Sequence, residues 1–371
     1  MKRLQMALAT ALILSALASP GVPGTGTASA RRGPELELSP AGSNVQGSTS
    51  TFDAGFSVLA YGNAPDFVQK TQVVLDRLVG LGVTSVSFVF PVFQQNWTAT
   101  DVYTDAERTP SGKNMSAFVR AAHERGMSVV LRPTLDEGSL VTDGKWRGTL
   151  QPADLMAWFS SYGVLMEGYA VFAESEGVES FIVGTEFSLL EKETAFWDDL
   201  ISDVRKVYTG RVSYSYNWDA QDLGFAGSLD YVGVDAFFPL DLPPGASVDE
   251  LVLAWQPWLD MLWNIQQVTG KDVTLTEVGT RSEAGSYQAP WVWEGDGPLS
   301  QEDQANYFEA TCAVAMTPAA RKEGRSFDGM YVWAADLNQG TDIPPADTGF
   351  TPLTKQAESV IEECYRVLAG S

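Results

Sequence analysis

From Phe52 onward the chain alternates between short apolar runs and longer stretches in which apolar residues recur with helical spacing. The apolar runs are nearly continuous, which is typical of strands that are buried on both faces. We expect eight strands, at residues 55–61, 85–93, 128–134, 180–186, 211–217, 231–237, 273–278 and 329–333. We expect helices near residues 65–81, 114–125, 153–176, 194–208, 248–269, 301–320 and 354–368. Only the stretch around residues 221–225 is too short for more than a turn or two.

Eight strand–helix alternations predict an α/β fold, the (β/α)₈ or TIM barrel. The main alternative is a doubly wound open sheet. No glycine-rich phosphate loop of the GxGxxG or GxxxxGK type follows any expected strand, which disfavours a nucleotide-binding sheet. No linker interrupts the alternation, so we expect a single catalytic domain over residues 51–371.

The N-terminal residues have the layout of a targeting segment. Lys2 and Arg3 precede an apolar stretch, and small residues at 28–30 suit a signal peptidase. An uncleaved membrane anchor is the alternative, but the apolar stretch is shorter than the roughly 20 residues that a span needs. The sequence predicts a secretory signal at residues 1–30, hence a secreted protein, and a flexible Gly-, Ser- and Pro-rich leader at residues 31–50.

The charge balance excludes one class of partner. The chain has 47 acidic and 24 basic residues, a formal net charge of −23. Such a surface repels nucleic acid, whereas a neutral polysaccharide meets no electrostatic penalty. No segment after the leader is apolar enough to cross a membrane, so we expect a soluble monomer.

Histidine and cysteine are too scarce for several kinds of active site. His123, the only histidine, lies in a predicted surface helix, which argues against a Ser-His-Asp triad or a histidine-ligated metal. Cys312 and Cys364 are either bridged after export or two free buried thiols. We therefore expect no cofactor and no metal, with chemistry carried by carboxylates, hydroxyls or aromatic rings.

Two glutamates stand where apolar strands end. Glu186 ends the fourth expected strand and Glu277 ends the seventh. Active sites of such barrels lie at the carboxyl ends of the strands, and the fourth and seventh strands face each other across the mouth. Glycoside hydrolysis needs two carboxyl groups flanking one bond, roughly 5–5.5 Å apart if the anomeric configuration is retained. One carboxyl must stay protonated while the other is ionised.

Several motifs resemble clan A of the glycoside hydrolases, and family 113, the β-1,4-mannanases, in particular. The resemblance covers roughly residues 52–368 and implies that Glu186 is the acid/base and Glu277 the nucleophile. Much of the clan has Asn before the acid/base, where it binds the sugar 2-hydroxyl; here that residue is Thr185, which leaves the sugar open. The motifs are VGTEF at 183–187, YSYNW at 214–218, VGVDAFFP at 232–239 and LTEVG at 275–279.

Other strand ends supply candidate substrate-binding residues. Arg132 could lower the pKa of the nucleophile or form a structural ion pair at the rim. Asn217 could bond sugar hydroxyls and Trp218 could stack on a sugar, or the two could be a turn residue and a core aromatic. Asp235 could line the pocket or cap the next segment. Trp333 takes the position where clan members commonly place the floor of the −1 subsite; ordinary packing is the alternative.

The loop after the seventh strand is rich in aromatic residues. Tyr287, Trp291, Trp293 and Glu294 could form a platform for further sugar units, or fold down as the loop's own small core. Taken together, the sequence predicts a retaining endo-β-1,4-mannanase or related β-glycanase. An exo-acting β-mannosidase and a catalytically inactive glycan-binding barrel are the alternatives.

Overall fold

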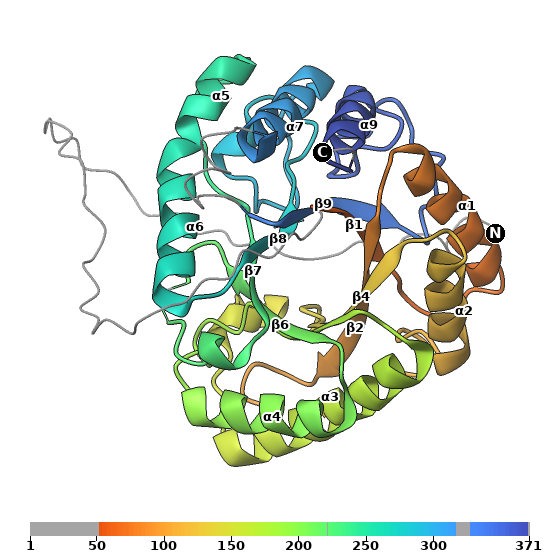
Figure 1. Ribbon diagram of the computed structural model, residues 1–371, viewed down its shortest axis with the longest axis vertical. Coiled ribbons are helices and arrows are strands. Elements are labelled where there is room, and N and C mark those ends of the chain that lie inside the picture. Colours follow the sequence, from red (N-terminus) through yellow and green to blue (C-terminus); the bar gives the residue numbers. More distant parts are fainter. Residues whose placement is uncertain (1–51, 221, 317–326, 370–371) are drawn as a thin grey trace, which may run out of the picture.

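The computed structural model describes residues 52–220, 222–316 and 327–369. The predicted signal at 1–30, the leader at 31–50 and the end of the expected helix at 317–320 lie outside the described residues. Eight parallel strands form a closed barrel, and Figure 1 shows the helices as a ring outside it. The barrel strands are β1 Asp53–Leu59, β2 Ser85–Gln94, β4 Ser128–Leu135, β5 Ser180–Thr185, β6 Arg211–Asn217, β7 Tyr231–Asp235, β8 Val273–Val278 and β9 Gly329–Asp336.

Closure of the sheet decides between the two fold predictions. Strand β1 pairs in parallel with β2 on one side and with β9 on the other, so the sheet has no open edge. The TIM barrel is confirmed and the doubly wound sheet is excluded. A ninth strand, β3 (Val102–Tyr103), was not expected; its two residues pair antiparallel with the end of β2 and are too few for a sequence pattern.

The helices follow the predicted order with one exception. The expected helix at 248–269 is two helices that meet at Trp255, because Pro257 has no backbone N–H and is tolerated only in a first helical turn. A short 3₁₀ turn, η3 (Ala226–Ser228), stands between β6 and β7, as expected. The helices are α1 Phe67–Gly80, α2 Gly112–His123, α3 Leu155–Glu176, α4 Thr194–Val207, α5 Val248–Ala254, α6 Gln256–Thr269, α7 Gln301–Met316 and α9 Gln356–Ala369.

Helix α3 shows how single residues set the two ends of a helix. The Asp154 side chain accepts a hydrogen bond from the N–H of Ala157 at 3.0 Å, which caps the first turn. Gly177 ends the helix in the left-handed conformation with φ of 69°, where a side chain is disfavoured. Between these residues Trp158, Tyr162 and Met166 are buried against the barrel.

The last two helices are covalently joined. A disulfide links Cys312 of α7 to Cys364 of α9, with the Cα atoms 5.8 Å apart, and it settles the question that the sequence left open. Within the part of the chain that the structure describes, none of the helices has the length and apolar character that a bilayer-crossing segment requires.

Candidate active site

The two glutamates lie at the carboxyl ends of β5 and β8, which β6 and β7 separate in the barrel. Glu277 is the penultimate residue of β8, and Glu186 directly follows β5. The predicted strand included Glu186, but the strand ends at Thr185, because Glu186 adopts a left-handed φ of 54° that cannot continue a strand. A non-glycine residue in this region costs on the order of 1 kcal/mol and is typical of functional sites.

Arg132 ties the nucleophile candidate to a second carboxylate. Its guanidinium lies 2.6 Å from an Oε of Glu277 and 2.8 Å from an Oδ of Asp235, and its side chain has no solvent exposure. It also donates to the hydroxyl of Thr185 at 3.3 Å and to the carbonyl of Thr276 at 3.1 Å. The two interpretations of Arg132 therefore coincide: it forms a buried ion pair, and the partner is the proposed nucleophile.

A register shift between β7 and β8 places Asp235 directly beside Glu277. Val234 pairs with Leu275, but the next residue, Asp235, pairs with Glu277, so Thr276 is skipped. Bulges of this kind turn a side chain that would otherwise alternate away. The hydroxyl of Thr276 donates to Asp235 at 2.8 Å and fixes its carboxylate. Asp235 thus lines the site as a wholly buried residue.

Two charged residues that the sequence did not single out complete the cluster. Arg147 lies in the loop after β4, in the 3₁₀ turn η2 (Arg147–Thr149). One of its nitrogens is 2.8 Å from Glu137, and another is 3.6 Å from Glu186. Both residues lie in a loop without periodicity, so no sequence signal distinguished them from solvated surface charges.

The cluster contains more carboxyl groups than cations. Burial, followed by the charge of Asp235, raises the pKa of Glu186 to about 8, and Arg147 opposes the rise. The same two causes raise the pKa of Glu277, and Arg132 opposes them. Arg132 thus lowers the pKa of Glu277, as expected from the sequence, against the larger effects of burial and of Asp235.

The contact distances indicate where the retained proton resides. An arginine can only donate hydrogen bonds, so the 2.6 Å contact of Arg132 favours an ionised Glu277. The contact of Glu186 with Arg147 is 3.6 Å, and that carboxyl loses less by being protonated. The arrangement therefore suits one carboxylic acid and one carboxylate across the mouth, as acid–base chemistry at a glycosidic bond requires.

Aromatic side chains wall the mouth. Trp333 is buried in a small apolar cluster with Val89, Phe237, Ala334 and Phe350. Its indole N–H has no hydrogen-bond partner among the described residues.

Trp218 is half-buried beside this cluster and stacks on Trp291 with ring centroids 5.2 Å apart. Asn217 instead bonds within its own turn, donating to Asp219 at 2.7 Å and accepting from the N–H of Trp218 at 3.0 Å. The geometry of Asn217 matches the turn interpretation.

The aromatic residues of the loop after β8 differ in their burial. Tyr287 is completely buried and belongs to the main hydrophobic core, whereas Trp291 and Trp293 remain 47% and 41% exposed. Trp293 stacks on Phe350, with the ring centroids 5.1 Å apart. The two tryptophans therefore have one face packed and one face free.

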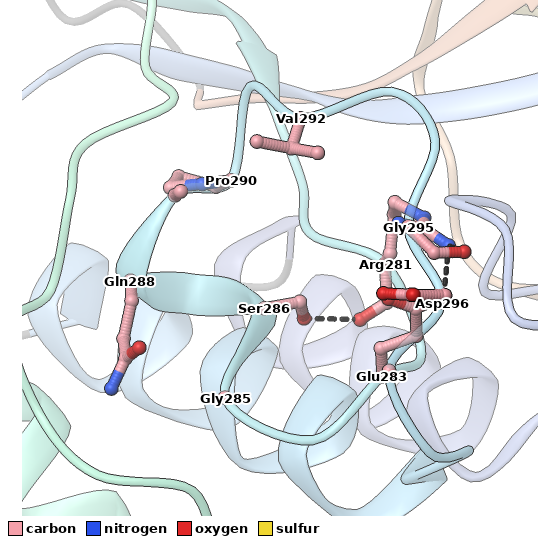
Figure 2. Close-up of a pocket in the computed structure, with 11 residues that line it drawn as sticks. Arg281, Glu283, Gly285, Ser286, Gln288, Pro290, Val292, Gly295 and Asp296 are labelled. Carbon is pink, nitrogen blue, oxygen red and sulfur yellow. Dashed lines mark hydrogen bonds and ion pairs between the residues drawn. The ribbon is translucent and has the colours of Figure 1, made fainter. Parts of the chain in front are cut away.

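The same loop encloses a cavity of about 190 Å³ (Figure 2). Arg281 and Glu283 form an ion pair inside it, and the hydroxyl of Ser286 donates to the carbonyl of Arg281. Neither Glu186 nor Glu277 lines this cavity, so the chemistry belongs to the barrel mouth. Among the described residues, no group of three or more His, Cys, Asp or Glu side chains is arranged to hold a metal ion.

Comparison with solved structures supports the same fold. A β-mannanase of glycoside hydrolase family 113 from Alicyclobacillus acidocaldarius superposes with a TM-score of 0.74 at 23% identity, over 86% of this chain and 99% of that one. Another family 113 β-1,4-mannanase gives 0.74 at 20% identity, over 85% and 99%. A family 5 mannosidase from Rhizomucor miehei gives 0.56 at 9% identity, over 86% and 94%.

A family model gives the assignment. No curated protein matches the chain. The model described as Glycoside Hydrolase Family 113 matches residues 64–355, which is well over half of the chain and includes both glutamates. The chain therefore belongs to glycoside hydrolase family 113, whose members are retaining glycoside hydrolases.

Proposed function

We propose that the chain is an endo-β-1,4-mannanase that works by double displacement, with Glu186 as acid/base and Glu277 as nucleophile. The observation that carries the proposal is the buried contact of Glu277 with Arg132, opposite a Glu186 whose pKa is raised to about 8. Burial and Asp235 raise the pKa of both glutamates, and the shorter arginine contact of Glu277 favours its ionised form and leaves the proton on Glu186.

In the first step, a carboxylate oxygen of Glu277 attacks the anomeric carbon while the bond to the leaving oxygen breaks. Glu186 donates its proton to that oxygen, so the shortened glycan leaves as an alcohol. The product is a glycosyl ester of Glu277. Arg132 holds the attacking carboxylate in position through its 2.6 Å contact, and Asp235 holds Arg132.

In the second step, Glu186, now ionised, takes a proton from water as the water oxygen attacks the anomeric carbon. The ester bond breaks, Glu277 leaves as a carboxylate, and Glu186 is again a carboxylic acid. Two inversions restore the original configuration. No other co-reactant is needed.

The choice of mannan rests on family membership and on the similar family 113 structures, which are β-mannanases. A screen of the purified protein on mannan, glucomannan, cellulose, xylan and galactan tests it. We expect hydrolysis of mannan and glucomannan, with oligosaccharides of mixed length as early products. Release of mannose alone would indicate an exo-acting enzyme. Activity on xylan or galactan but not mannan would refute the sugar.

The roles of the two glutamates are tested by substitution. Glu277→Ala should abolish turnover of every substrate, a loss on the order of 10⁵-fold, because no ester can form. Glu186→Ala should lower kcat/KM on mannan far more than on an aryl glycoside with a good leaving group, since such a group needs no proton in the first step. Azide should accelerate this variant by attacking the ester without a base. Equal losses on both substrates without azide rescue would contradict the assignment.

We also propose that the protein is exported, cleaved after residue 30 and monomeric. The basic, apolar and small residues of 1–30 support export. The Cys312–Cys364 disulfide is consistent with an oxidising compartment. The N-terminal sequence and solution mass of the protein recovered from the culture medium test these points. Retention inside the cell, or the mass of a dimer, would contradict them.

A further inference from the structure

A buried carboxyl group that the proposed mechanism does not use lies behind Glu186. Glu191 follows β5 by six residues, and only 1% of its surface is exposed. The hydroxyl of Tyr214, on β6, donates to an Oε of Glu191 at 3.1 Å. The same hydroxyl oxygen accepts a hydrogen bond from the backbone N–H of Phe187 at 2.7 Å. A chain of two hydrogen bonds thus connects Glu191 to the peptide that follows Glu186.

Tyr214 is rigidly held. Its ring lies 5.1 Å from those of Trp197 and Phe225 and 4.6 Å from that of Tyr216, centroid to centroid. A Cβ on Gly184 would come within 2.7 Å of the ring, so the ring packs directly on the backbone of β5. The hydroxyl is therefore fixed with respect to the strand that carries Glu186.

The backbone of Glu186 needs such support. Its φ of 54° is unfavourable for a residue with a side chain. The N–H of Glu186 donates to the carbonyl of Ser215 at 2.8 Å, and the next N–H, of Phe187, donates to Tyr214. Strand β6 thus holds the peptide on each side of the Glu186 Cα. Loss of the Tyr214 hydroxyl would leave a buried N–H unsatisfied and free this turn to rotate.

We propose that Tyr214 and Glu191 are positioning residues, which hold the Glu186 carboxyl where it can protonate the leaving oxygen. The inference rests on the proposed role of Glu186. Tyr214 acts through the peptide of Phe187. Glu191 acts by accepting a hydrogen bond from the Tyr214 hydroxyl, which orients the lone pair of that hydroxyl toward the Phe187 N–H. Burial raises the pKa of Glu191 to about 8, so it is a neutral acid near pH 7 and adds no negative charge behind Glu186.

Tyr214→Phe tests the proposal, with Tyr208→Phe as its matched control. Tyr208 is also buried, and its hydroxyl donates to the carbonyl of Val178 at 2.8 Å, at the opposite end of β5. The values of kcat/KM on mannan and on a dinitrophenyl β-manno-oligosaccharide are compared for each variant. For Tyr214→Phe we expect kcat/KM, which reports the first step, to fall roughly 30-fold on mannan and by less than about threefold on the aryl substrate, because in that step only the unactivated leaving group needs the proton of Glu186. Tyr208→Phe should keep the wild-type ratio.

Substitutions at Glu191 test the proposal a second time without changing Tyr214. Glu191→Gln keeps an oxygen acceptor and should keep the wild-type ratio of the two kcat/KM values. Glu191→Leu removes the acceptor and should lower kcat/KM on mannan selectively, as Tyr214→Phe does. If every Tyr214 and Glu191 variant that stays folded by circular dichroism lowers both kcat/KM values equally, or neither, the proposal is overturned.

Glu186→Ala in the same assay separates this inference from the proposed function. If Glu186→Ala is selective for mannan while Tyr214→Phe and Glu191→Leu are not, the positioning role fails and the acid/base role stands. If Glu186→Ala is not selective, the proposed function itself fails, and the positioning role fails with it.

Discussion

The two ends of the barrel use the same side chains in different surroundings. At the mouth, Arg132 has no exposed surface and lies 2.6 and 2.8 Å from two carboxylates. At the base, the Arg211 side chain is 46% exposed and lies 3.9 Å from Asp53 and 3.8 Å from Asp328. Solvated pairs of the second kind contribute about 0–1 kcal/mol each to stability, whereas breaking a buried pair leaves an uncompensated charge.

Uncharged hydrogen-bonding groups also differ between the two ends of the barrel. At the base, Tyr331 bonds to Ser85 at 2.7 Å and Tyr231 bonds to Ser180 at 2.8 Å. At the mouth, the buried Trp333 indole N–H has no partner among the described residues. These two pairs at the base each join strands of the barrel through hydroxyl groups that satisfy one another. At the mouth, charge is crowded and hydrogen-bonding capacity is left open, and such an arrangement is expected where a substrate enters.

Arginine substitutions should reveal the largest difference between the ends. Arg132→Ala should lower kcat/KM roughly 10³-fold and the free energy of unfolding by about 3–5 kcal/mol, because Asp235 and Glu277 would be left buried without a cation. Arg211→Ala should change the free energy of unfolding by at most about 1 kcal/mol and leave kcat/KM unchanged. Urea denaturation and mannan hydrolysis measure the two effects. Equal effects of the two substitutions would contradict the claim that the buried ion pairs at the mouth matter more than the exposed ones at the base.

The pH dependence of activity should also differ between substitutions at the mouth and at the base of the barrel. Glu186 must be protonated to act as an acid and its pKa is about 8, so kcat/KM on mannan should fall about tenfold per pH unit above that value. Arg147 lowers this pKa, so Arg147→Gln should move the alkaline limb to higher pH. At the base, burial raises the pKa of Asp328 to about 6, yet Asp328→Asn should leave the activity profile unchanged. An alkaline limb that Arg147→Gln shifts to lower pH would contradict the assignment of that limb to Glu186.

Aromatic substitutions should give the smallest effects. Trp218→Ala should lower kcat/KM about tenfold if its ring stacks on a sugar, since such contacts contribute on the order of 1.4 kcal/mol. Tyr231→Phe, at the base, should lower the free energy of unfolding by about 1 kcal/mol through loss of the Ser180 bond and leave kcat/KM unchanged. An unchanged kcat/KM for Trp218→Ala would remove this residue from the substrate site.

Local patterns in the sequence predicted elements well where burial is regular. All eight barrel strands were predicted because a strand buried on both faces is a continuous apolar run. The helix at 248–269 was predicted as one because its periodicity hides the break at Pro257. Arg147 and Glu137 were missed because they lie in a loop, where no periodicity separates a buried charge from a solvated one.

The order of apolar and polar residues was enough to predict the barrel, the two glutamates at the ends of two of its strands and the short list of polar strand ends, because these follow from local alternation of burial. Only the tertiary structure decided that Arg132 meets Asp235, 103 residues away, and that a register shift places Asp235 beside Glu277. It also decided that the Tyr214 hydroxyl lies under the peptide after Glu186. These contacts and the raised pKa values depend on distances across a closed barrel and on loss of solvent, neither of which is written in the pattern of neighbouring residues.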